Sequence, residues 1–153
     1  MNTHHLNTHH MNAELAAAQE ALVRAMTAGG QLPPGFDEAG VRVAARAILR
    51  KRAGEVARAW PALAASYGQD WPETFARWAA ERPTNGSIRD AWDFARAHKD
   101  SLDAAAALEL ALTETRFHYD GESPPRPRRL AVRRVPGGVA FQLNGRARLI
   151  SRR

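Results

Sequence analysis

Apolar residues recur every three to four positions along most of the first two thirds of the chain. The pattern is clearest over residues 12–28 and 37–60, where leucine, valine, isoleucine and methionine fall at this spacing. Such spacing places apolar side chains on one face of an α-helix. Asn12 and Asp37 are suited to cap helix N-termini, and a pair of glycines ends the first stretch. We therefore predict a long helix over each of the two stretches.

Prolines and glycines divide the following residues into shorter helical segments. Pro61 and Gly68 bound the first, because proline suits the start of a helix and glycine suits its end. The later segments carry apolar residues at helical spacing behind an Asp or a Ser that can cap them. The expected ranges are 61–68, 70–82, 87–98 and 101–117. Residues 12–118 are thus predicted to form an all-α domain of five to six helices.

The four tryptophans of the chain all fall within these helical segments. Large aromatic residues at helical spacing usually form a hydrophobic core. An aromatic groove that binds a ligand is the alternative. We expect a core made of Trp60, Trp71, Trp78 and Trp92.

The pattern changes at Tyr119. Residues 119–128 contain three prolines and a glycine, which predict an extended linker. Three short runs rich in β-forming residues follow, and Asn-Gly between the last two is a strong hairpin signal. We predict a small antiparallel sheet over residues 129–153, with Val139, Phe141 and Leu143 on one face. Strands this short need an apolar surface to lie on, so we expect the sheet to dock on the helical domain. The fold class is mainly α.

The N-terminal residues 1–11 contain four of the six histidines in a repeated Asn-Thr-His-His motif. We predict a disordered segment here. Paired histidines can bind a metal weakly, but no Asp, Glu or Cys within the segment completes a set of ligands.

Positive charge is concentrated at the C-terminus. Residues 126–153 contain nine arginines and no Asp or Glu, whereas the preceding residues have a net charge of −3. Localised positive charge indicates an acidic partner. Twenty arginines against two lysines also indicate a GC-rich genome, so codon usage accounts for part of the excess.

The sequence contains no recognisable catalytic motif. Absence of cysteine excludes disulfides, thiolate metal sites and cysteine nucleophiles. There is no glycine-rich phosphate loop, no Gly-x-Ser-x-Gly elbow and no His-Glu-x-x-His motif. No segment reaches the roughly 20 apolar residues of a membrane span. We predict a cytoplasmic protein that is not an enzyme and uses no cofactor.

Two groups of arginines are the candidate partner-binding residues. One is a stripe on the second helix, for which a solvated face is the alternative. The other lies in the C-terminal strands, where an edge strand can pair with an extended acidic peptide. The same arginines can lie along the phosphates of a nucleic acid, or can simply prevent edge-to-edge aggregation. The residues are Arg42, Arg46 and Arg50 in the first group, and Arg128, Arg129, Arg133, Arg134, Arg146 and Arg148 in the second.

The order of several motifs resembles a known helical family. WPALAASYG at 60–68, WPETFARWA at 71–79, RPTNGSI at 82–88 and WDFAR at 92–96 follow one another. Over about residues 37–97 this order resembles the helical part of the bacterial "putative DNA-binding domain" family. The whole chain resembles small actinobacterial proteins of unknown function encoded beside multinuclear non-heme iron-dependent oxidative enzymes.

This resemblance implies a non-catalytic accessory protein. Its expected partner is a multinuclear iron-dependent oxidative enzyme that modifies a ribosomally made precursor peptide, or the acidic precursor peptide itself. Nucleic-acid binding by the C-terminal arginines is the alternative. The net negative charge of the helical domain argues against it, and phosphate contacts alone give weak, salt-sensitive binding.

Overall fold

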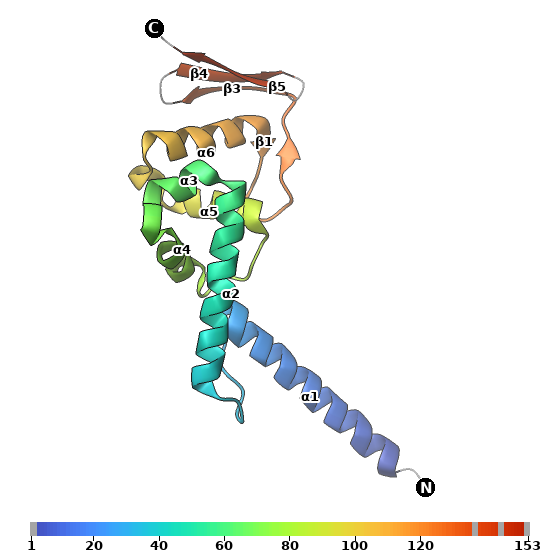
Figure 1. Cartoon of the computed structure of the whole chain (residues 1–153). Helices are drawn as coiled ribbons and strands as arrows, with labels where there is room; N and C mark the ends of the chain where they lie inside the picture. Colours follow the sequence, from blue (N-terminus) through green and yellow to red (C-terminus); the bar gives the residue numbers. More distant parts are fainter. Residues whose placement is uncertain (1–2, 136–137, 144–145, 152–153) are drawn as a thin grey trace. The chain divides into compact units, whose positions relative to one another are not determined.

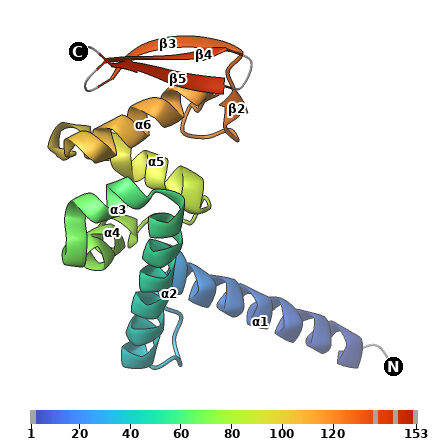
Figure 2. The same cartoon turned by 45° about the horizontal axis from the view of Figure 1, so that its top comes forward.

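The computed structural model describes residues 3–135, 138–143 and 146–151. Within these residues the chain forms six α-helices followed by five β-strands (Figures 1 and 2). The mainly α architecture with a C-terminal antiparallel sheet is confirmed. The residues group into two compact units, Met1–Ala53 with Pro72–Thr84 and Gly54–Trp71 with Asn85–Arg153. The C-terminal sheet shares a unit with helices.

The first unit contains α1 (Thr3–Ala28), the larger part of α2 (Glu38–Ala59) and most of α4 (Trp71–Ala79). Asp37 caps α2 as predicted. Its carboxylate oxygens accept hydrogen bonds from the backbone N–H groups of Ala39 at 3.1 Å and Gly40 at 2.8 Å. These bonds satisfy donors that have no partner within the helix.

Helix α1 begins at Thr3, whereas the sequence predicts a disordered segment before a start at Asn12. No proline or glycine lies between the two positions, so nothing in the backbone stops the helix there. The side chains of Met11, Leu15 and Val23 are each more than half exposed, so the apolar face of α1 is largely uncovered. The side chains of residues 1–10 lie outside the described part, and the predicted weak metal ligands are among them.

An aromatic core lies in the second unit, among α3 (Pro61–Tyr67), α5 (Ser87–Ala97) and α6 (Ala104–Arg116). The ring of Trp92 lies with its centroid 6.1 Å from that of Trp60 and 5.0 Å from that of Tyr119. Each of these side chains is at most 4% exposed. Burial of such large rings supplies much of the hydrophobic stabilisation of this unit.

The tryptophan core prediction holds for three of the four residues. Trp60, Trp71 and Trp92 are buried. Trp78 is only half-buried, and the guanidinium of Arg82 lies over its ring, 4.8 Å from the centroid. Trp78, expected in the core, is thus only partly buried, and its ring contacts both the ring of Phe75, with centroids 5.6 Å apart, and the guanidinium of Arg82.

The last helix begins later than predicted. Lys99–Ser101 forms a short 3₁₀ turn, and α6 is capped by Asp103, whose Oδ1 accepts a 2.8 Å hydrogen bond from the N–H of Ala106. Several residues before α6 are of types that can cap a helix, and the sequence does not distinguish among them.

The three C-terminal strands form the predicted antiparallel sheet. β3 (Leu130–Val135), β4 (Gly138–Leu143) and β5 (Arg146–Ser151) lie in the order β3-β4-β5. The predicted turns at 136–137 and 144–145 lie outside the described residues. All three strands contact α6, and Figures 1 and 2 both show the sheet lying over this helix. Docking of the sheet on the helices is confirmed.

The predicted linker is anchored at both ends. Tyr119 is 4% exposed, and β1 (Phe117–His118) pairs antiparallel with β2 (Arg126–Pro127). Pro127 has no backbone N–H to donate. It is tolerated in β2 because this side of its backbone is at the open edge of the two-stranded ribbon, where no partner strand needs a donor. The pairing of β1 with β2 thus fixes the two ends of the extended segment that the sequence predicts over residues 119–128.

Replacing tryptophans one at a time tests this core. We expect Trp92→Ala to lower the free energy of unfolding by about 3–5 kcal/mol, because the substitution leaves a large cavity. Trp78→Ala should cost clearly less, because this side chain is half-buried. Urea unfolding followed by circular dichroism measures both, and a larger loss for Trp78→Ala would contradict this core.

Candidate functional site

The arginine stripe on α2 is paired with carboxylates of its own unit. Arg42 bonds Glu38 at 2.8 Å, one turn away on the same helix. Arg46 and Arg50 both bond the Oε1 of Glu73 in α4, at 3.0 and 2.6 Å. The hydrogen bond from Arg50, followed by that from Arg46, holds the pKa of Glu73 below its usual range. These ion pairs are what a solvated helix face forms, and binding of a partner here stays a prediction.

Two of the C-terminal arginines bond residues in and just after the last turn of α6. The Nε of Arg128 donates to the carbonyl oxygen of Phe117 at 3.1 Å, and its Nη2 lies 3.2 Å from Nδ1 of His118. Arg133 in β3 donates to Oε2 of Glu114 in α6. Both side chains therefore join the C-terminal segment to the end of α6.

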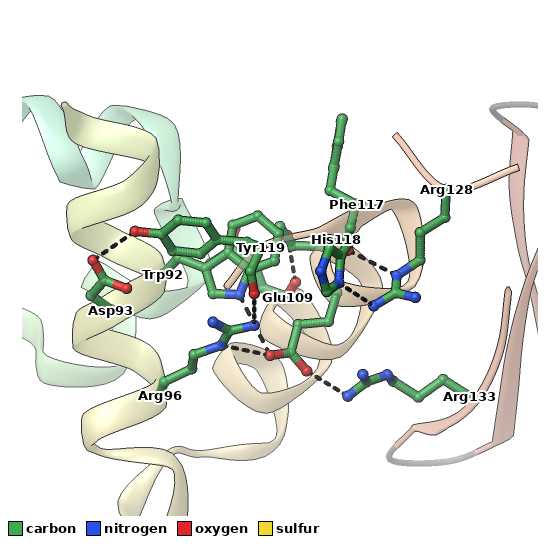
Figure 3. Close-up of polar contacts among 11 residues, drawn as sticks. Trp92, Asp93, Arg96, Glu109, Phe117, His118, Tyr119, Arg128 and Arg133 are labelled. Atoms are coloured by element: carbon green, nitrogen blue, oxygen red, sulfur yellow. Dashed lines mark hydrogen bonds and ion pairs between the residues drawn. The ribbon is translucent and has the colours of Figure 1, made fainter. Parts of the chain in front are cut away.

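Glu114 is the centre of this junction. Besides Arg133, its carboxylate accepts from Nε of Arg96 at 2.9 Å and from Nε1 of Trp92 at 3.5 Å, both in α5. Its side chain is only 15% exposed. In Figure 3, the labelled guanidinium groups of Arg96 and Arg133 lie on opposite sides of one carboxylate, and both bond it. A single carboxylate thus joins α5 and the sheet to α6.

Sequence reasoning missed Glu114, although the sequence carries a signal for it. The residue lies in the last turn of α6, where the helix dipole disfavours negative charge. An acidic residue at this position indicates a specific cationic partner. The sequence does not identify the partner, because Arg96 and Arg133 come from distant segments.

Side-chain alternation divides the sheet into two faces. The inner face lies against α6, and its described members are Ala131, Arg133, Val135, Gly138, Ala140, Gln142 and Leu149. Gln142 is 1% exposed, and its Nε2 donates to the carbonyl oxygen of Arg128 at 2.6 Å. The opposite side, here called the outer face, is directed away from α6. Its described members are Leu130, Val132, Arg134, Val139, Phe141, Leu143, Arg148 and Ile150.

The outer face is apolar and exposed. Val132 is 72% exposed, Leu130 69%, Ile150 61% and Leu143 57%. Val139, Phe141 and Leu143 share one face, as predicted, but the buried residues of the sheet are Val135, Ala140 and Gln142 on the opposite, inner face. Much of the apolar surface of the sheet is thus directed outward.

Arginines lie at both edges of the outer face. The register aligns Arg134 with Val139 and Ile150 in one row. It aligns Arg148 with Phe141 and Val132 in the next row, at the opposite edge.

These two arginines are exposed, and so is Arg129. None of the three forms an ion pair with a residue that the structure describes. Arg146 pairs with Leu143 in the backbone register, and its side chain lies outside the described residues.

A pocket of about 500 Å³ lies beside α5, lined by Ile88, Trp92, Phe117 and Pro125 among others. The Tyr119 hydroxyl lies close by in a small polar network, 3.0 Å from Oδ2 of Asp93. Burial, and then the neighbouring Asp93, raise the pKa of Tyr119 to about 12. Burial also raises the pKa of Asp93. The tyrosine hydroxyl therefore stays protonated near neutral pH and does not act there as a base or nucleophile.

Among the residues that the structure describes, no three His, Cys, Asp or Glu side chains come together as metal ligands. No described helix has the length and apolar character needed to cross a membrane. The geometry offers two features that can take a partner, the outer face of the sheet and the apolar pocket beside α5.

Comparison with known proteins identifies the helical part of the chain. Residues 16–100 match the SCO6045-like, C-terminal domain family, and the chain belongs to this family. A UPF0276 protein of Streptomyces avermitilis, an actinobacterium, is 43% identical over 82 residues. The aligned part covers 53% of this chain and 17% of that protein, so the chain spans about a sixth of the relative's length. No solved structure matches.

The match ends before α6, so α6 and the sheet follow the family segment. The expected actinobacterial relationship agrees with the Streptomyces relative. The expected neighbouring iron enzyme and the likeness to the "putative DNA-binding domain" family stay predictions.

Substitutions at the Glu114 junction test how much it contributes to the free energy of unfolding. We expect Glu114→Ala to lower the free energy of unfolding by about 2–3 kcal/mol, because two guanidinium groups and an indole N–H lose their acceptor. Arg133→Ala should cost at most about 1 kcal/mol, because this side chain is 43% exposed. Urea unfolding measures both, and equal costs would contradict a shared junction.

The raised pKa of Tyr119 predicts a pH dependence. Above pH 10 the unfolded chain loses this proton while the folded chain retains it until about pH 12. The stabilising contribution is therefore fully present below pH 10 and is lost as the pH rises through about 12. Between these pH values, wild type should lose more stability than Tyr119→Phe in urea unfolding. Identical pH profiles would show that the hydroxyl is not held as described.

Proposed function

We propose that this member of the SCO6045-like, C-terminal domain family is a non-catalytic accessory protein. Its partner is an iron-dependent peptide-modifying enzyme or the acidic precursor peptide of that enzyme. The observation that carries the proposal is the C-terminal sheet, which exposes apolar side chains together with arginines. Arg134 and Arg148 are exposed there and form no ion pair with a described residue. A surface that is both apolar and cationic suits an acidic protein or peptide.

The relative from Streptomyces avermitilis supports a role beside another protein. In that relative the aligned segment makes up 17% of a longer UPF0276 protein. A domain that shares a chain with a larger partner acts next to it at high effective concentration. We infer that the same kind of domain in this chain also acts next to a larger protein.

The edges of the sheet offer a second way to hold a peptide. β3 and β5 are the outer strands, each paired on one side only among the described residues. An extended peptide can add to such an edge through backbone hydrogen bonds. Arg148 on β5 would then lie beside the peptide and favour acidic residues.

Nucleic-acid binding is the second candidate, and one observation favours it. Arg129, Arg134 and Arg148 are exposed and form no ion pair with a described residue, as cations that contact phosphates would be. Against it, the stripe Arg42, Arg46 and Arg50 is already paired with carboxylates, and the C-terminal arginines surround apolar side chains. We also propose a cytoplasmic location, since an enzyme that modifies ribosomal peptides works where they are made.

Genomic context and a binding assay test the function together. The neighbouring genes should encode an iron-dependent oxidative enzyme or a short acidic peptide, and that product should co-purify with the tagged chain. Filter binding with DNA and RNA at low salt tests the alternative function, nucleic-acid binding. Tight binding that falls steeply with salt, without any protein partner, would favour nucleic acid and contradict the proposal.

Charge reversal locates the interaction. We expect Arg134→Glu combined with Arg148→Glu to abolish partner binding while unfolding stays within about 0.5 kcal/mol of wild type, because both side chains are exposed and exposed charges contribute little to stability. Arg77→Glu, an exposed charge change in α4, is the control and should bind normally. Undiminished binding by the double variant would place the partner elsewhere.

A further inference from the structure

The C-terminal sheet exposes apolar side chains on the face that is directed away from α6. An antiparallel sheet with one solvated face usually places apolar residues inward and polar residues outward. Here the inner face buries Val135 and Ala140 beside Arg133 and Gln142, yet on the outer face Val132, Leu143 and Ile150 are each more than half exposed. Contiguous exposed apolar side chains on this scale mark a surface that another molecule covers.

We propose that the outer face binds one amphipathic helix of the partner protein, with acidic residues on both sides of its apolar stripe. This rests on the proposed function and specifies the mode of contact. The helix lies across the sheet face, as the second helical layer of a helix-sheet-helix arrangement, instead of pairing as a strand with an edge.

The dimensions of the sheet suit a single helix. Three strands about 4.8 Å apart span about 10 Å, which is the diameter of a helix with its side chains. Strands of six residues are about 20 Å long, which corresponds to a helix of about 13 residues. The apolar residues occupy the middle strand and parts of both edge strands, so a stripe of i, i+3, i+4 and i+7 side chains can cover them.

The positive charge of the outer face indicates which kind of partner binds there. Arg134 lies at the β3 edge of the outer face and Arg148 at the β5 edge, so cations flank the apolar centre on both sides. Residues 126–153 contain nine arginines and no acidic residue. Stacking two copies of this sheet face to face would therefore bring like charges together without compensation. A helix flanked by Asp and Glu supplies the missing charges.

The test uses a designed 14-residue helical peptide, with leucines at i, i+3, i+4 and i+7 and flanking glutamates. A scrambled peptide of the same composition is its control. We expect the designed peptide to bind the full chain, to gain helical circular dichroism, and to shift the NMR methyl signals of Val132, Leu143 and Ile150. Val132→Ser combined with Leu143→Ser should weaken binding at least tenfold, and the scrambled peptide should bind no better than that variant.

A matched control lies in α1. Leu15→Ser combined with Val23→Ser removes apolar side chains of comparable exposure from a helix of the other unit and should leave binding unchanged. Both double variants replace exposed residues, so unfolding curves close to wild type are expected and verify that folding is retained.

Four outcomes would overturn the proposal. One is equal binding of the two peptides, and another is a bound peptide that gains β-strand signal at β5. A third is a wild-type dimer that Val132→Ser with Leu143→Ser converts to a monomer. In the fourth, wild type binds phosphatidylglycerol–phosphatidylcholine vesicles but neither peptide, and Val132→Ser with Leu143→Ser abolishes the binding to vesicles. Co-purification separates the two proposals: a natural partner that still binds this variant refutes the outer face but leaves the accessory function intact.

Discussion

The carboxylate of Glu114 is the contact on which the arrangement of the second unit depends. It lies in the last turn of α6 and takes hydrogen bonds from Trp92 and Arg96 of α5 and from Arg133 of β3. A carboxylate that is 15% exposed needs such partners, because an uncompensated charge at low exposure is costly. Two cations must therefore be brought to it from different elements. This requirement places the sheet on α6.

The same contact decides which face of the sheet is exposed. Neighbouring residues of a strand are directed to opposite faces, so Arg133 on the α6 side puts Val132 and Arg134 on the other. On β4, Gln142 reaches the Arg128 carbonyl at 2.6 Å, which puts Phe141 and Leu143 outward. Arg133 and Gln142 thus bond the end of α6 from the same face that buries Val135 and Ala140. The result is an apolar and cationic surface, which is the basis for assigning this protein a binding role.

The sequence predicts local structure well and long-range pairing poorly. Helical spacing, the cap at Asp37 and the three β-forming runs are local signals, and the structure bears them out. Alternation correctly placed Val139, Phe141 and Leu143 on one face, but which face is buried depends on Glu114, far away in the chain. The stripe on α2 was recognised, whereas its pairing with Glu73 was not, because the bonded residues lie 23 and 27 positions apart. The contact of Arg82 with the Trp78 ring was not predicted either.

The orientation of the sheet is the central claim, and solvent paramagnetic relaxation of methyl groups measures it most directly. Val132 and Val135 lie on the same strand, three residues apart, and are 72% and 8% exposed. With a soluble paramagnetic agent, the methyl signals of Val132 and Ile150 should broaden strongly while those of Val135 stay sharp. Protection of Val132 and Ile150 together with broadening of Val135 would mean that the apolar face lies against α6, and would contradict this account.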